Sequence, residues 1–223
     1  MPEVACAVRW HRSARARRVS LKISPREAAV IITLPMRAAR RAGMALLNEH
    51  AAWVTQRLAA IEPPQALAPG ASVLIGDIAH PIIHAAQRRG GAVLEDGALV
   101  VTGAAEFLPR RIADFLRAEA GRRIATAVAP HAQALGVRPR AIRLKDTQTR
   151  WGSCAPNGNL AFSWRLVMAP GWVLDYVVAH ELAHLREMNH SPRFWALVET
   201  RTPHREAATA WLRTNGARLL RVG

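Results

Sequence analysis

Cysteine, lysine and long apolar runs are scarce in this chain of 223 residues, and each shortage excludes a class of protein. Its two cysteines, Cys6 and Cys154, are too few for a disulfide-rich scaffold or a thiolate zinc site, and we expect both to be reduced. No apolar run is long enough to cross a bilayer, which argues against a membrane partner. Residues 1–18 carry Arg and His where a signal peptide needs an apolar core, so we expect a cytoplasmic protein.

Arginine supplies nearly all the positive charge, because Lys22 and Lys145 are the only lysines while the net charge is +15. An arginine-rich surface attracts phosphates, which would suit a nucleic acid or nucleotide partner. The alternative is that abundant Arg and Ala reflect a GC-rich coding bias, since the arginines are scattered along the chain. Only residues 9–18 are dense enough in charge to suggest a basic arm.

The chain is half hydrophobic, enough for a real core, and its patterns predict an α+β protein. We expect residues 1–104 to form a β-rich region with one helix, and residues 105–223 to form the catalytic domain. In the first region, turn residues separate short strand-like runs, and apolar spacing predicts a helix. The strands are expected at 19–23, 28–34, 73–75, 80–85, 92–94 and 98–101, and the helix at 40–61.

In the second region, an amphipathic pattern predicts a helix over residues 109–135, broken or ended near Pro130 and capped by Gly136. Strands are expected at 142–144, 149–151 and 160–162, with Asn157-Gly158 as the turn between the last two. After Pro170 the pattern is helical nearly to the end of the chain.

The sequence His180-Glu181-Leu182-Ala183-His184 carries the chemistry. Two histidines four positions apart lie on one face of a helix, where both imidazoles can bind the same metal ion. Zn²⁺ binds neutral imidazole well, and Glu181 is placed to take a proton from an activated water. The alternative is an ordinary helix with core or solvated histidines. The helix is apolar on nearly all sides, however, and unpartnered polar groups there would be costly.

A third ligand has to come from beyond this helix. We expect the helix to end near Met188, with Asn189 as a left-handed cap and Ser191-Pro192 as the start of the next helix. His190 then lies in a tight turn that folds back beside His184, and it is the predicted third ligand.

These motifs resemble those of the YgjP-like metallopeptidases. The resemblance is carried between residues 142 and 195 by Arg150-Trp151-Gly152-Ser153-Cys154, Trp164-Arg165-Leu166, Asp175-Tyr176-Val177-Val178, His180 to Leu185 and Asn189-His190-Ser191. It implies a zincin-like fold with an active-site helix and a small sheet, similar to SprT-type proteases. It also implies zinc on His180, His184 and His190, with Glu181 catalytic. Ser163 stands where the family usually has Asn, and Glu187 and the lack of a Met-turn separate the chain from metzincins.

Three further residues are candidates for substrate binding. Trp151 would either form the floor of a cleft beside an edge strand or pack in the core. Arg165 and Tyr176 are candidate donors to a transition-state oxyanion, although each would equally serve the structure. Cys154 is expected to be a packing residue, because the sequence implies no base that would activate it.

The leading functional hypothesis is zinc-dependent hydrolysis of a protein or peptide substrate. A metal-dependent nucleotide phosphohydrolase would suit the basic charge, but the sequence lacks a phosphate-binding glycine loop. A DNA-associated protease recruited by its basic surface is another alternative. A purely structural zinc site is disfavoured because it would need no base beside the metal.

Overall fold

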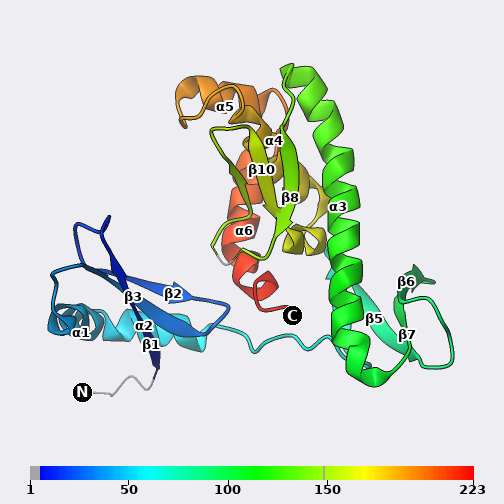
Figure 1. Cartoon of the computed structure of the whole chain (residues 1–223), viewed down its shortest axis with the longest axis horizontal. Coiled ribbons are helices and arrows are strands. Elements are labelled where there is room, and N and C mark those ends of the chain that lie inside the picture. Colours follow the sequence, from blue (N-terminus) through cyan, green and yellow to red (C-terminus); the bar gives the residue numbers. More distant parts are fainter. Residues whose placement is uncertain (1–5, 148) are drawn as a thin grey trace. The chain divides into compact units, whose positions relative to one another are not determined.

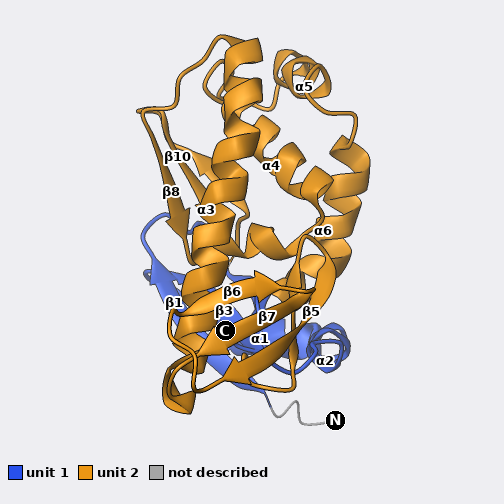
Figure 2. Cartoon of the chain, turned by 90° about the vertical axis from the view of Figure 1, so that its right-hand side faces the viewer, with its two compact units in different colours: residues 1–65, 220–222 blue, residues 66–219, 223 orange. Residues whose placement is uncertain are grey.

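The structure is a computed structural model that describes residues 6–147 and 149–223. Its internal contacts divide the chain into two compact units (Figure 2). The first comprises residues 1–65 and 220–222, and the second residues 66–219 and 223. Both units mix strands with helices, which confirms the expected α+β class. The boundary expected near Ala104 falls inside the second unit, and as a division between regions of different function it stays a prediction.

The first unit is a small sheet with two helices packed on it. Its strands lie in the order β1-β3-β2, and the strands expected at 19–23 and 28–34 are the antiparallel pair β2 and β3. Apolar residues of β3 and both helices form its core: Val30, Ile32, Leu34, Leu47 and Val54. The elements are β1 (Ala7–Ser13), β2 (Ser20–Ser24), β3 (Ala29–Pro35), α1 (Arg40–Glu49) and α2 (Ala51–Ala59).

Two predictions for this unit are wrong in detail. Much of the suggested basic arm is strand β1, which pairs parallel with β3 so that Trp10 lies opposite Ile32. The single helix expected at 40–61 is split at His50, whose φ of −103° and ψ of 18° depart from helical values. Each half still buries an apolar side chain in the same core, Leu47 from α1 and Val54 from α2.

The second unit begins with a sheet in the order β4-β5-β7-β6. Its strands fall where the sequence predicted them, because the turns between them carry residues that tolerate positive φ. Gly76-Asp77 has φ values of 65° and 68°, and Asp96-Gly97 has 48° and 77°. The strands are β4 (Ser72–Ile75), β5 (Ile78–Ala85), β6 (Ala92–Glu95) and β7 (Ala98–Thr102).

A long helix, α3 (Leu108–Leu135), follows the short 3₁₀ helix η1 (Ala105–Phe107). The predicted cap is confirmed, since Gly136 has a left-handed φ of 60°. The predicted break at Pro130 is wrong: the helix continues through it. Apolar burial on both sides of the proline offsets the lost hydrogen bond, which costs about 3 kcal/mol. The buried face is Leu108, Ile112, Leu116, Ala120, Ile124, Val128, His131 and Leu135.

The remaining elements of this unit surround helix α4 (Figure 1). A sheet in the order β8-β10-β9 precedes it, with β9 antiparallel to β10 across the Asn157-Gly158 turn. The strand expected at 149–151 lies instead at 152–154, because this register pairs Cys154 with Leu160. The elements are β8 (Ala141–Lys145), β9 (Gly152–Cys154), β10 (Asn159–Ser163), η2 (Trp164–Met168), α4 (Gly171–Ala183), α5 (Pro192–Glu199) and α6 (Arg205–Leu219).

Helix α4 is the centre of the second unit, and it packs against α3, α5, α6 and β9. Nine of its thirteen residues are buried, as its apolar sequence predicted. Cys6 and Cys154 are both free thiols, in agreement with the expected reduced state. No helix among the described residues is long and apolar enough to span a membrane.

Candidate metal centre

The C-terminal end of α4 carries two of the three predicted histidines. His180 lies within the helix and His184 is its C-cap residue, so their rings stand one turn apart with centroids 5.0 Å from each other. The helix ends at Ala183 rather than near Met188, and the chain leaves it through turns. Asn189 is not left-handed, since positive φ among described non-glycine residues occurs only at Ala28, Asp77 and Asp96.

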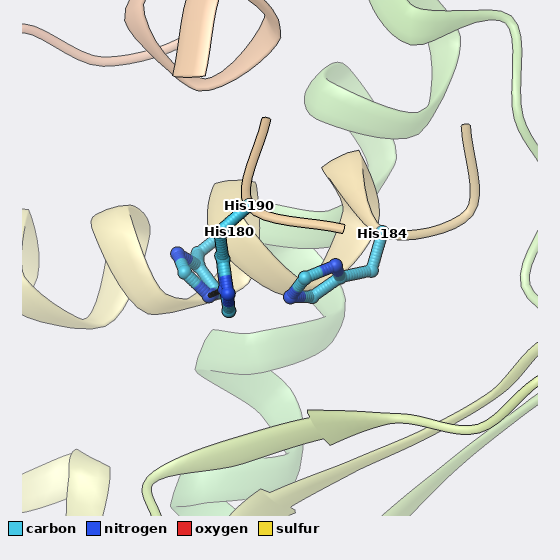
Figure 3. A group of neighbouring side chains, drawn as sticks. All are labelled: His180, His184 and His190. Carbon is cyan, nitrogen blue, oxygen red and sulfur yellow. Dashed lines mark hydrogen bonds between the residues drawn. The ribbon is translucent and has the colours of Figure 1, made fainter. Parts of the chain in front are cut away.

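The start of α5 places the third histidine. Ser191 caps this helix by accepting a hydrogen bond from the backbone N–H of Phe194 at 3.3 Å, and Pro192 occupies the first turn, as predicted. The cap directs the preceding residue, His190, back over α4. Its Nε2 lies 3.2 Å from Nε2 of His180 (Figure 3). One nitrogen from each of His180, His184 and His190 lies within 4.8 Å of the others, a grouping that could hold a metal ion.

Aromatic side chains of α5 fix two of these rings. Phe194 is fully buried and stacks on His184 with centroids 4.4 Å apart. Trp195 stacks on His190 at 5.5 Å, and the guanidinium of Arg205 covers the Trp195 ring at 3.6 Å. The orientation of the imidazoles is therefore built into the packing of α5 on α4.

The environment of His180 and His184 favours the neutral imidazole, which is the form that binds metal. Burial, with smaller contributions from His184 and His190, lowers the pKa of His180 to about 4. Burial likewise lowers the pKa of His184. Nδ1 of His184 lies 3.1 Å from the carbonyl oxygen of Glu187, so with its proton there the ring leaves Nε2 free as a ligand.

Glu181 is a buried carboxylate beside the histidines. Its exposed fraction is 6%, and burial raises its pKa to about 7, although the nearby charge of Arg150 opposes the shift. The backbone of β9 passes directly against this side chain. A Cβ added at Gly152 would lie 2.5 Å from Oε1 of Glu181, so only glycine leaves room for the carboxylate here.

Two cavities meet at this point of α4. The first, of about 320 Å³, contains all three histidines, and the second, of about 250 Å³, lies toward α6. Gly152, His180 and Glu181 line both. The other residues of the first cavity are Arg150, Ser153, Cys154, His184, Met188 and His190. The others of the second are Trp151, Tyr176, Val177, Thr209 and Leu212.

The structure brings two of the three candidate substrate-binding residues to these cavities. Trp151 and Tyr176 line the second cavity. Arg165 lies elsewhere: it is 1% exposed, its guanidinium contacts Asp146 and it lies over the ring of Trp164 at 4.3 Å. Arg165 lines neither cavity, and its contacts with Asp146 and Trp164 are structural.

Sequence reasoning missed several residues of the site. Arg150 and Gly152 belong to a segment whose motif was evident, but their proximity to Glu181 depends on the pairing of β9 with β10. Nothing in the sequence pointed to Thr209 and Leu212, since they come from α6 and lie 28 and 31 positions after Glu181.

Comparison with known proteins shows which family the chain belongs to. No curated protein matches the chain. A crystal structure of the metallopeptidase zymogen of Pyrococcus abyssi abylysin shares 21% identity and a TM-score of 0.37, and the match covers 42% of this chain and 92% of that one. The family model described as YgjP-like, metallopeptidase domain, matches residues 17–215, which is most of the chain. The chain therefore belongs to the YgjP-like metallopeptidase family.

Proposed function

We propose that the protein is a zinc-dependent peptidase in which His180, His184 and His190 hold the metal and Glu181 is the general base. The observation that carries the proposal is the convergence of three imidazoles beside one buried carboxylate at the edge of an open cavity. A structural zinc site would have no use for such a base.

The donor set suits zinc. Zn–N bonds of about 2.0–2.1 Å at a tetrahedral angle place two ligand nitrogens about 3.3 Å apart. The Nε2 atoms of His180 and His190 are 3.2 Å apart, and the ligand nitrogens of all three histidines lie within 4.8 Å of one another, so this one pair has the tetrahedral spacing. Three imidazoles and no further ligand from the described residues match a catalytic site with an open position, and imidazole favours zinc over Mg²⁺ or Ca²⁺.

Glu181 has the properties of a proton shuttle. When bound, zinc supplies Lewis-acid polarisation of the peptide carbonyl and of the attacking water. The Glu181 carboxylate accepts one proton from that water as oxygen attacks the carbonyl carbon. It then donates the same proton to the departing amine as the C–N bond breaks. A carboxyl with a pKa near 7 can perform both transfers close to neutral pH.

The proposal is tested with Glu181→Gln and His184→Ala. We expect purified wild type to bind one zinc ion, measured by mass spectrometry of the metal, and to cleave a proteome-derived peptide library. Glu181→Gln should keep the zinc and lose activity by at least about a thousandfold. His184→Ala should lose the zinc while its circular dichroism stays unchanged. Full activity of Glu181→Gln, or hydrolysis of nucleoside triphosphates in place of peptides, would overturn the proposal.

A further inference from the structure

The second cavity at α4 has its own walls, and we call it the α6 pocket. Its floor is Tyr176 and Val177 of α4, both less than 10% exposed. One wall is the ring of Trp151, and the other is formed by Thr209 and Leu212 of α6. These two residues are three apart on the helix and so share one face.

Helix α6 also holds the Trp151 wall in place. Gly216 lies one turn beyond Leu212 on the same face, and a Cβ there would come within 3.0 Å of Cζ2 of Trp151. The indole therefore packs on bare helix backbone. This close packing means that the width of the pocket depends on the side chains of α6 rather than on a mobile tryptophan.

The chemistry of the α6 pocket is mostly apolar. Among the described residues that line it, none is Lys or Arg, and Glu181 is the only carboxylate. Its hydroxyl groups have partners within the protein: Oγ1 of Thr209 donates to the backbone carbonyl of Arg205 at 2.7 Å, and Oη of Tyr176 lies 3.4 Å from the same Oγ1. An apolar side chain of a ligand would bury apolar surface in this pocket, which favours binding. An acidic side chain would be buried beside the Glu181 carboxylate, which disfavours binding.

The position of the α6 pocket links it to the reacting bond. Glu181 and His180 line both cavities, so a carbonyl held beside the histidines is next to the mouth of the pocket. An extended peptide advances about 3.3 Å per residue, so only a residue flanking that carbonyl can reach inside.

We propose that the α6 pocket binds one large apolar side chain of the peptide substrate, such as Leu, Met or Phe, beside the bond that is cleaved, and that Leu212 sets the size accepted. This proposal rests on the proposed peptidase function and names the substrate class of that site.

The test compares cleavage profiles on a proteome-derived peptide library, mapped by mass spectrometry. Zinc-loaded wild type is expected to prefer Leu, Met or Phe at one position flanking the bond. Leu212→Trp fills the pocket, so the preference should move to Gly or Ala, with kcat/KM for Leu-containing peptides reduced by about 10-fold to 100-fold. Leu212→Ala should shift it toward Phe and Trp. Arg213→Ala, at the exposed neighbouring position of α6, is the control and should leave the profile unchanged.

A binding measurement keeps the pocket separate from the chemistry. Zinc-loaded Glu181→Gln is titrated by calorimetry with acetylated oligo-alanine peptides that carry one Leu, one Asp or neither. The Leu peptide is expected to bind about tenfold tighter than the others, and added Leu212→Trp should abolish the difference. If cleavage shows no preference at the positions flanking the bond, or if neither Leu212 variant changes that preference, the proposed role of the α6 pocket is wrong while the peptidase function stands. Absence of cleavage by zinc-loaded wild type overturns the peptidase function, and the calorimetry then still decides the pocket.

Discussion

Gly152 lies where a methyl group would displace the carboxylate of Glu181. The added Cβ would approach Oε1 to 2.5 Å and Cγ to 2.6 Å, so either Glu181 or strand β9 has to move. We expect Gly152→Ala to lower kcat/KM by about a hundredfold, since a shift of about 1 Å in a catalytic group has an effect of that size. Zinc content should stay unchanged because β9 supplies no histidine.

Gly171→Ala is the matched control for this substitution. Gly171 is the first residue of α4 and is exposed. Apart from its chain neighbours and the nearby backbone of its own helix, no heavy atom lies within 4 Å of a Cβ added there. Its replacement should leave kcat/KM and zinc content as in wild type. If Gly152→Ala also kept full activity, the carboxylate would not need the position that it occupies against β9.

Single residues differ in how far the sequence predicts them. His180, Glu181 and His184 are predictable because one helix turn brings them together whatever the rest of the fold does. His190 is predictable because Ser191 and Pro192 are typical of a helix start, which places His190 in the turn just before that helix. Gly152 is not, because its contact with Glu181 joins residues 29 positions apart and exists only in the packed structure.

Glu119 gives a pH dependence that is independent of the metal centre. Hydrogen bonds from Arg122 at 2.6 and 2.7 Å and from Arg123 at 2.7 Å lower its pKa from 4.5 to about 2. A carboxyl with a lowered pKa stabilises the fold above its ordinary pKa, and that contribution disappears as pH falls from about 4.5 to about 2.

In metal-free protein, Glu119→Gln should therefore lower the free energy of unfolding at pH 7 by about 1–2 kcal/mol, a figure reduced for the exposure of the arginines. The difference from wild type should shrink toward zero near pH 2. Urea denaturation at both pH values measures it, with the exposed Glu106→Gln as a control that changes little at either. A constant difference across this range would contradict the ionic origin.

At the scale of elements, a polar contact joins the metal-bearing helix to α3. Nε2 of His131, a 7% exposed residue of α3, lies 2.7 Å from Oδ1 of Asp175 on α4. Asp175→Ala leaves that buried nitrogen without its partner, which should cost about 1–3 kcal/mol in the free energy of unfolding. Asp114→Ala on α3 removes ion pairs with Arg110 and Arg117 that are more than a third exposed, and it should cost under about 1 kcal/mol. Equal losses in the two variants, measured by urea denaturation, would show that the α3–α4 contact has no special weight.

Elements were predictable where local chemistry specifies them, and not where packing does. The turns at Gly76-Asp77 and Asp96-Gly97 and the cap at Gly136 depend on φ > 0, which few residues tolerate. Strand β1 was missed because its arginines hide the alternation of Val8 and Trp10, and its partner β3 is reached only by tertiary pairing. The helix continues through Pro130 because Val128 and His131 pack on either side of it.

At the scale of the whole molecule, several of the arginines that give the chain its net charge of +15 have structural contacts. Arg12 donates to the carbonyl oxygen of Met36 at 2.6 Å, and Arg221 to that of Pro25 at 2.5 Å. Arg111 reaches the carbonyl oxygen of Thr102. These contacts give the positive charge a role in holding loops and termini, separate from any phosphate-bearing partner.

The division into two compact units has a measurable consequence for metal binding. All three histidines and Glu181 lie in the second unit, so zinc should stabilise that unit against unfolding and leave the first unit unaffected. A ligand at a hundred times its Kd adds about 2.7 kcal/mol to the unit that binds it, which slows global exchange of its amides about a hundredfold. Hydrogen-exchange mass spectrometry with zinc and with EDTA should show this slowing in α4 and β10 and no change in β3. In His184→Ala, zinc should slow amide exchange in neither unit. Equal slowing in β3 would mean that the two units unfold together, in which case a ligand bound at α4 stabilises the whole chain.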